Sequence, residues 1–205
     1  MNRRSALKNL TMSLGYAVAT PTIFNMLASC HAEVESWTPL FLSPEEKHMV
    51  THLADIILPT SDTPGALDVN IPQFLDLMYH DIEKKENQEL FRKGAAIFAQ
   101  KFNMPVLDLN KDDFEKSLSS YFNISDEDTE NILKDQKLPL AKVKNDHIEN
   151  YSLYKFLLSV KYYTLFGYFS SEKVGKEVLV YDPIPGSYQS CISIDEATGG
   201  RAWSL

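Results

Sequence analysis

The sequence predicts an all-α fold, a single domain of about five to six helices followed by an irregular, extended C-terminal arm. Three observations indicate this fold class. Ser43-Pro44-Glu45-Glu46 combines an N-cap residue, a proline at the first helical position and a capping-box carboxylate. Residues 146–166 form a long apolar run of helical length. After Gly167, prolines and glycines interrupt the helical periodicity.

The spacing of apolar residues places the helices along the chain. The first helix starts after Ser43 and ends before Pro59, and two more are expected over residues 72–82 and 88–102. Asn110 with Asp113, and Ser125 with Asp128, place an N-cap residue three before a carboxylate and so open two short acidic helices. The side chains expected to face inward in these four later helices are Phe74, Leu75, Met78 and Ile82; Leu90, Phe91, Ala95, Phe98 and Phe102; Phe114, Leu118 and Tyr121; and Ile132 and Leu133.

The longest predicted helix covers residues 146–166. Tyr, Phe, Leu and Val occur on nearly every side of it, so it is predicted to be the central, buried helix. The arm, residues 168–205, contains Tyr181-Asp182-Pro183-Ile184-Pro185-Gly186, which cannot be helical because two prolines and a glycine fall within four residues.

The N-terminal segment reads as an export signal. Arg3-Arg4 is a twin-arginine pair, a weakly apolar stretch follows, and Leu27-Ala28-Ser29-Cys30 resembles a bacterial lipobox. Gly15 and Pro21 interrupt the stretch, which therefore favours a signal peptide over a spanning helix. We expect residues 1–29 to be the signal peptide, residues 30–42 a tether and residues 43–205 the domain with its arm. The protein is then expected to be exported in folded form to the periplasm and held at a membrane by lipid on Cys30.

Charge excludes one class of partner. The chain has a net charge of −8, and removing residues 1–29 takes away three basic and no acidic residues, which leaves −11. Such a surface would repel nucleic acid, whose binding depends on basic patches. Membrane attachment must therefore come from the lipid, and the several acyl chains of a lipoprotein cysteine anchor stably.

Cys30 and Cys191 are the two cysteines of the chain. If Cys30 carries lipid, Cys191 is a lone thiol, and a buried, inert Cys191 is the favoured reading. A Cys30–Cys191 disulfide is the competing interpretation, and it is incompatible with lipidation.

The search for chemistry finds no phosphate-binding loop, dinucleotide fingerprint, haem-attachment motif or nucleophile elbow. The best metal candidate is His48 with His52, four residues apart on the first helix, with Asp55 on the same face. These three lie opposite the apolar stripe of that helix, so a solvated polar face is the favoured reading. No catalytic, cofactor-binding or metal-binding residue is predicted.

The arm concentrates residue types that are enriched at interface hot spots, namely Tyr181, Tyr188, Arg201 and Trp203. Two readings remain open for it. The arm either wraps its own domain or docks, wholly or partly, onto a partner. The aromatic residues of the 146–166 helix are expected to be core.

Three stretches together resemble a known family. They are Phe41-Leu42-Ser43-Pro44-Glu45-Glu46 leading to Ile57-Leu58-Pro59, then Asp62-Thr63-Pro64-Gly65-Ala66, and finally Tyr181-Asp182-Pro183-Ile184-Pro185-Gly186 with Gly199-Gly200-Arg201-Ala202-Trp203. In these stretches the chain resembles the gluconate 2-dehydrogenase subunit 3 family, the small subunit of membrane-associated sugar dehydrogenases.

The resemblance implies a partner rather than an activity of this chain. Members accompany a large flavoprotein dehydrogenase of the glucose-methanol-choline type, which carries FAD, and a cytochrome c subunit with haem often completes the complex. The small subunit carries the large one through the twin-arginine pathway. It is not known as the site of chemistry, which agrees with the empty motif search. A lipobox is not general to the family.

The leading hypothesis is thus a non-catalytic accessory subunit that escorts, stabilises and anchors a flavin dehydrogenase. One alternative is an enzyme or metal protein that uses His48, His52 and Asp55. The other is a free-standing periplasmic lipoprotein that binds a small ligand in an aromatic pocket.

Overall fold

The structure of the chain is a computed structural model that describes residues 37–184, 186–187 and 190–204. Two units divide the chain, Met1–Thr38 and Pro39–Leu205, and the helices described here belong to the second. The signal-peptide residues Arg3 and Arg4, the lipobox residue Cys30 and the arm residue Tyr188 lie outside the described residues.

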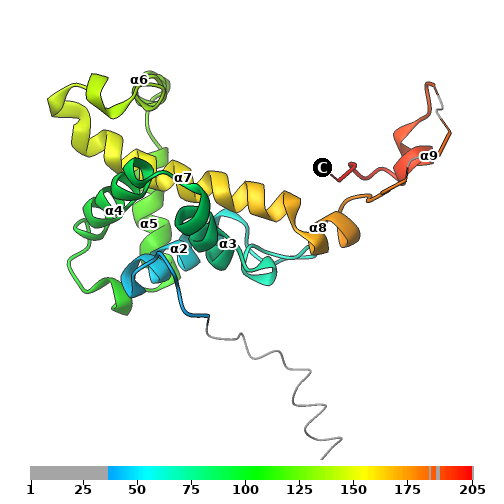
Figure 1. Ribbon diagram of the computed structural model, residues 1–205, viewed down its shortest axis with the longest axis horizontal. Helices are drawn as coiled ribbons and strands as arrows, with labels where there is room; N and C mark the ends of the chain where they lie inside the picture. The colour runs from blue at the N-terminus through cyan, green and yellow to red at the C-terminus, as the bar shows by residue number, and fades with distance from the viewer. Residues whose placement is uncertain (1–36, 185, 188–189, 205) are drawn as a thin grey trace, which may run out of the picture. The chain divides into compact units, whose positions relative to one another are not determined.

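The second unit is all-α, as predicted (Figure 1). Six helices correspond to the six expected from the sequence, and two short ones, α8 and α9, lie in the predicted arm. The α-helices are α2 (Pro44–Ile57), α3 (Ile71–Leu77), α4 (Lys85–Ala99), α5 (Lys111–Phe122), α6 (Asp126–Gln136), α7 (Ile148–Ser170), α8 (Glu172–Glu177) and α9 (Ile194–Thr198). A π-helix, Met78–Ile82, continues α3, and short 3₁₀ turns include η3 (Val106–Asp108).

Side-chain caps start the helices where the sequence predicts them. Ser43 accepts a hydrogen bond from the Glu46 amide while the Glu46 carboxylate accepts one from the Ser43 amide, a complete capping box. Asn110 and Asp113 form the same reciprocal pair at α5. Two further caps, Ser171 at α8 and Ser193 at α9, start helices that were expected to be irregular arm.

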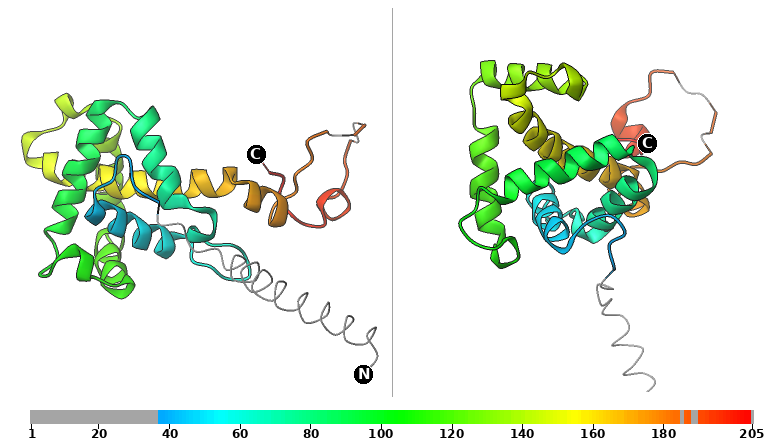
Figure 2. Two further views of the ribbon diagram at one scale, coloured as in Figure 1. Left: turned by 60° about the horizontal axis from the view of Figure 1, so that its bottom comes forward. Right: turned by 60° about the vertical axis from the view of Figure 1, so that its left-hand side comes forward.

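Helix α7 is the central helix, and it packs against α2, α3, α4, α6 and α8 (Figures 1 and 2). It crosses α4 at very short range: a Cβ atom added to Gly94 would lie 2.1 Å from the Ser152 carbonyl oxygen and 2.6 Å from the Phe156 Cβ. Only glycine allows two helix backbones to come this close. Gly167 faces side chains of α3 instead of backbone, and an added Cβ there would lie 2.6 Å from the Phe74 ring and 2.8 Å from the Ile71 Cδ1.

Of the fourteen side chains predicted to face inward in α3 with its π-helix, α4, α5 and α6, six are buried, six are half-buried and two are exposed. Leu133 on α6 is exposed, and Ile82 is exposed because it ends the π-helix rather than an α-helix. A π-helix has more residues per turn, so the α-helical spacing used to place Ile82 inward does not apply there. Cys191 was expected to be buried and is exposed, on a turn with φ 59°.

The domain begins before residue 43. Asp76 of α3 is buried, and its carboxylate accepts three backbone hydrogen bonds, from the amides of Leu40 (2.8 Å), Phe41 (3.0 Å) and Leu42 (2.7 Å). Phe41 and Leu42 are themselves buried. The last residues of the expected 30–42 tether are therefore part of the folded domain.

The close approach at Gly94 gives a stability prediction. Gly94→Ala should destabilise the domain by about 1–3 kcal/mol, because the new methyl group meets backbone atoms of α7 that cannot move aside. Urea unfolding followed by circular dichroism measures this change.

Gly175 of α8 is the matched control, because the nearest atom to an added Cβ there is 3.8 Å away. Gly175→Ala should leave stability unchanged or raise it by up to about 1 kcal/mol, since alanine favours a helix. Equal unfolding midpoints for the two variants would show that the α4–α7 crossing is not tightly packed.

Candidate functional site

The C-terminal arm folds back on its own base. The Val180 amide donates to the Ala202 carbonyl and the Ser204 amide to the Val180 carbonyl, each at 2.9 Å, so that Val180 and Trp203 form an isolated parallel bridge. Within the described part of the arm, the hydrogen bonds of residues 190–204 run to one another or to Val180. The bridge thus closes the backbone between Val180 and Trp203 into a loop, and the side chains of Tyr181, Ile184 and Trp203 are exposed to solvent.

The predicted interface residues are exposed where the structure describes them. Tyr181 is 55% exposed and Trp203 54%, and Arg201 is exposed as well. Ile184, which the sequence analysis did not select, is 83% exposed. The arm therefore presents apolar side chains to solvent instead of burying them in its own domain.

Helix α7 is not buried on every side, contrary to the prediction. Tyr162, Phe166 and Phe169 are 60%, 44% and 41% exposed. Their spacing of i, i+4 and i+7 places them on one face of the helix. The sequence contained this spacing, but buried aromatic residues such as Tyr154, Phe156 and Tyr163 surround it and hide it.

A groove of about 310 Å³ connects this face to the arm. Its walls include Phe169 of α7, Gly175 and Lys176 of α8, and Tyr181 and Ser204 of the arm. Phe169 and Tyr181 thus lie on the same hollow of the surface, although they belong to different segments.

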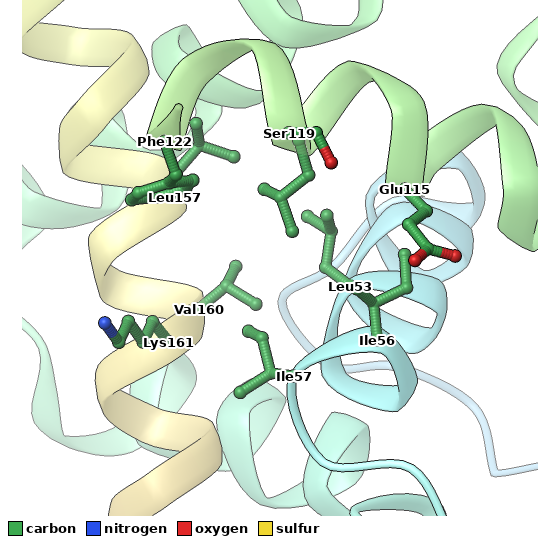
Figure 3. Close-up of a pocket in the computed structure, with 10 residues that line it drawn as sticks. Leu53, Ile56, Ile57, Glu115, Ser119, Phe122, Leu157, Val160 and Lys161 are labelled. Atoms are coloured by element: carbon green, nitrogen blue, oxygen red, sulfur yellow. The ribbon is translucent and has the colours of Figure 1, made fainter. Parts of the chain in front are cut away.

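A second cavity, of about 360 Å³, lies between α2, α5 and α7 (Figure 3). Figure 3 shows Leu53, Ile57 and Val160 pointing into it, with the charged ends of Glu115 and Lys161 toward its edges. The lining is chiefly aliphatic.

Tyr162 also borders a polar cavity of about 270 Å³. Within it the Glu83 carboxylate accepts hydrogen bonds from the Tyr163 hydroxyl and the Asn87 amide, each at 2.5 Å. Burial raises the pKa of Tyr163, and its bond to Glu83 raises that pKa further. Tyr163 is thus a protonated donor at neutral pH, and Glu83 already has partners within the domain.

The face with His48, His52 and Asp55 is partly covered, whereas a solvated face was expected; all three residues are half-buried. The His48 Nε2 lies 2.9 Å from the Leu109 carbonyl oxygen, and the His52 ring stacks on Phe114 of α5 at 5.2 Å. Asp55 pairs with Lys111. The sequence correctly predicted that these residues lie on the side of α2 opposite its apolar stripe. It gave no indication that α5 and η3 pack against that side.

His48, His52 and Asp55 are not grouped as a set of metal ligands in the described structure. Burial lowers the pKa of His52, and the neighbouring His48 lowers it further, so the imidazole is neutral near pH 7. However, the Asp55 carboxylate is held by an ammonium group. Across the part of the chain that the structure describes, no three His, Cys, Asp or Glu side chains are grouped so that they could hold a metal ion.

The described residues form a small helical domain with an exposed aromatic arm. They contain no group of His, Cys, Asp or Glu side chains that could hold a metal ion. The chain belongs to the gluconate 2-dehydrogenase subunit 3 family, whose model matches residues 44–186. This family is a subunit of a dehydrogenase complex, so membership implies a dehydrogenase as partner. Searches among curated proteins and among solved structures found no match. In the described residues no helix combines the length and the apolar character needed to cross a membrane.

The geometry around His48 and His52 leads to a prediction about metal. The purified protein, incubated with zinc and then desalted, should retain far less than one zinc per chain, because two imidazoles without a free third ligand bind weakly. Elemental analysis measures the ratio. Stoichiometric zinc that disappears in the His48→Ala, His52→Ala double variant would contradict this reading and support the metal-protein alternative.

Proposed function

We propose that this chain is the non-catalytic small subunit of a periplasmic, flavin-dependent dehydrogenase of the glucose-methanol-choline type that oxidises a sugar or sugar acid. The observation that carries the proposal is the family match over residues 44–186, which covers most of the domain. The catalytic FAD belongs to the partner chain, and in complexes of this family a cytochrome c subunit with haem often completes the assembly.

Export and anchoring are further parts of the proposal. The twin-arginine pair Arg3-Arg4 directs export of folded protein, and the small subunit escorts the dehydrogenase subunit through the same route. After cleavage, lipid on Cys30 holds the complex at the membrane. What supports these roles is the order of the two signals in the first thirty residues.

A pair of variants tests export and anchoring. Arg3→Lys with Arg4→Lys should leave this subunit and the dehydrogenase subunit in the cytoplasm, and Cys30→Ala should release the exported subunit from membranes. Cell fractionation and immunoblotting measure both effects. If the Cys30→Ala protein, produced without its partner, stays on membranes through a high-salt wash, then lipid on Cys30 is not the anchor.

The arm provides the test of partner binding. Trp203→Ala and Tyr188→Ala should each weaken co-purification of the dehydrogenase subunit, because truncating one aromatic hot spot costs about 2 kcal/mol or more, roughly thirty-fold in affinity. Helical content and melting temperature should stay nearly unchanged, since the Trp203 side chain is half exposed.

Leu133→Ala, at an exposed leucine of α6, is the control and should co-purify like the wild type. Arm variants that unfold the domain would assign the arm to its own core. Arm variants that fold and still capture the dehydrogenase subunit at wild-type levels would place the interface elsewhere.

A further inference from the structure

The second half of α7 is the least expected part of the surface. Tyr162, Phe166 and Phe169 form an exposed aromatic row on the helix that otherwise supplies the core. Isolated apolar side chains are normal on a surface, but a contiguous apolar patch marks an interaction site.

Ring contacts and a shared groove make the aromatic row contiguous. The rings of Tyr162 and Phe166 stack at 5.9 Å with 9° between their planes. Phe169, one turn further on, lines the same groove as Tyr181 of the arm. We define Tyr162, Phe166, Phe169 and Tyr181 as the aromatic face. The aromatic face continues to the exposed Trp203 of the arm, because Trp203 forms a bridge with Val180, the residue before Tyr181.

The size of this surface suits an interface. A fully buried aromatic side chain covers roughly 150–250 Å². The four half-exposed rings of the aromatic face, together with Trp203, therefore offer on the order of 500 Å². A standard interface buries about 800 Å² on each partner. The exposed rings can supply most of the apolar centre of one such interface.

The charges near the aromatic face differ from those of the whole chain. The chain has a net charge of −8, yet residues 150–171 contain Lys155 and Lys161 and no acidic residue. Just beyond them Lys173 is exposed, while Glu172 is paired with Lys176. On its α7 side the aromatic face thus has lysines beside it and no carboxylate between residues 150 and 171. Asp182 is exposed next to Tyr181 on the arm side, and Glu83 beside Tyr162 is bound by Tyr163 and Asn87 within the domain. An apolar patch bordered by carboxylates is complementary to the α7 side.

We propose that the aromatic face of α7, continuous with the arm, is the docking surface for the dehydrogenase subunit, which presents to it an apolar patch bordered by acidic side chains. This inference rests on the proposed function. It extends the contact from the arm to helix α7 of the domain. A second copy of this chain and a lipid surface are the competing occupants that the experiment distinguishes.

The first experiment is co-purification of the full-length chain with the dehydrogenase subunit, both expressed from the native genes. Tyr162→Ala with Phe169→Ala should lower the affinity for the dehydrogenase subunit about thirty-fold or more. Phe166 is left unchanged because it contacts Phe74 of α3. The matched control is Phe122→Ala with Leu133→Ala, which removes similar exposed area from α5 and α6.

The second experiment does not depend on truncating side chains to alanine. A photo-crosslinking phenylalanine analogue replaces Tyr162 in one protein and Phe122 in another. The analogue should crosslink to the dehydrogenase subunit from position 162 and not from position 122. Because Tyr162 is well exposed, the replacement leaves the fold intact, and a melting curve checks this.

The outcomes separate the inference from the proposed function. If the wild-type chain captures no dehydrogenase subunit, the proposed function fails. If the wild type captures it, the double variant captures it equally and position 162 gives no crosslink, the function stands and the aromatic face is not the interface. Crosslinks from position 162 to a second copy of this chain, or to lipid, in place of the dehydrogenase subunit would likewise overturn the inference.

Discussion

The close approach of α7 to its neighbours is the constraint on which the rest of the domain depends. Gly94 brings the backbone of α4 against Ser152, in the first half of α7, and Gly167 lets α3 reach the second half. Phe91 and Phe98 of α4 then both contact Phe156 of α7. The two glycines thus set how closely α4 approaches the first half of α7 and how closely α3 approaches its second half.

Helix lengths explain why α7 is covered unevenly. At 1.5 Å per residue, the 23 residues of α7 extend about 34 Å, the 15 of α4 about 22 Å and the 7 of α3 about 10 Å. Helix α4 packs along the first half, where Tyr151, Tyr154 and Phe156 are buried. The second half receives α3 on one side, where Phe74 contacts Phe166, and Tyr162, Phe166 and Phe169 on its outer face remain 41–60% exposed. The exposed aromatic face therefore follows from the dimensions of the fold.

A polar cluster fixes how the chain enters the domain. Beside the three amides bound to Asp76, Arg92 of α4 donates to the Glu46 carboxylate at 2.9 Å and to the Phe41 carbonyl oxygen at 2.6 Å. Hydrogen bonds with one charged partner are stronger than neutral ones. The guanidinium also lies 4.2 Å from the centre of the Phe41 ring. Residues 40–46 are thus tied to both α3 and α4.

Local signals in the sequence predicted the helix starts, because a capping box involves residues only three apart. Ser43 with Glu46, and Asn110 with Asp113, form the expected bonds. The contacts that Asp76 and Arg92 make across the domain could not be predicted in this way. Asp76 binds amides 34 to 36 residues away, and no spacing rule connects a carboxylate in one helix with the chain that precedes another.

Periodicity fixes the angle of a residue about its own helix and leaves open which neighbour covers that angle. His52 was placed correctly opposite the apolar stripe, yet Phe114 of α5 stacks on it. Tyr162 was assigned to the core with Tyr163, and one is 60% exposed while the other is buried. Both errors have the same origin, since coverage depends on the lengths and crossings of other helices. Because α7 carries aromatic residues on several sides, its sequence does not tell which side stays exposed; only the positions of the neighbouring helices do. The exposed side is where a partner subunit can complete the packing.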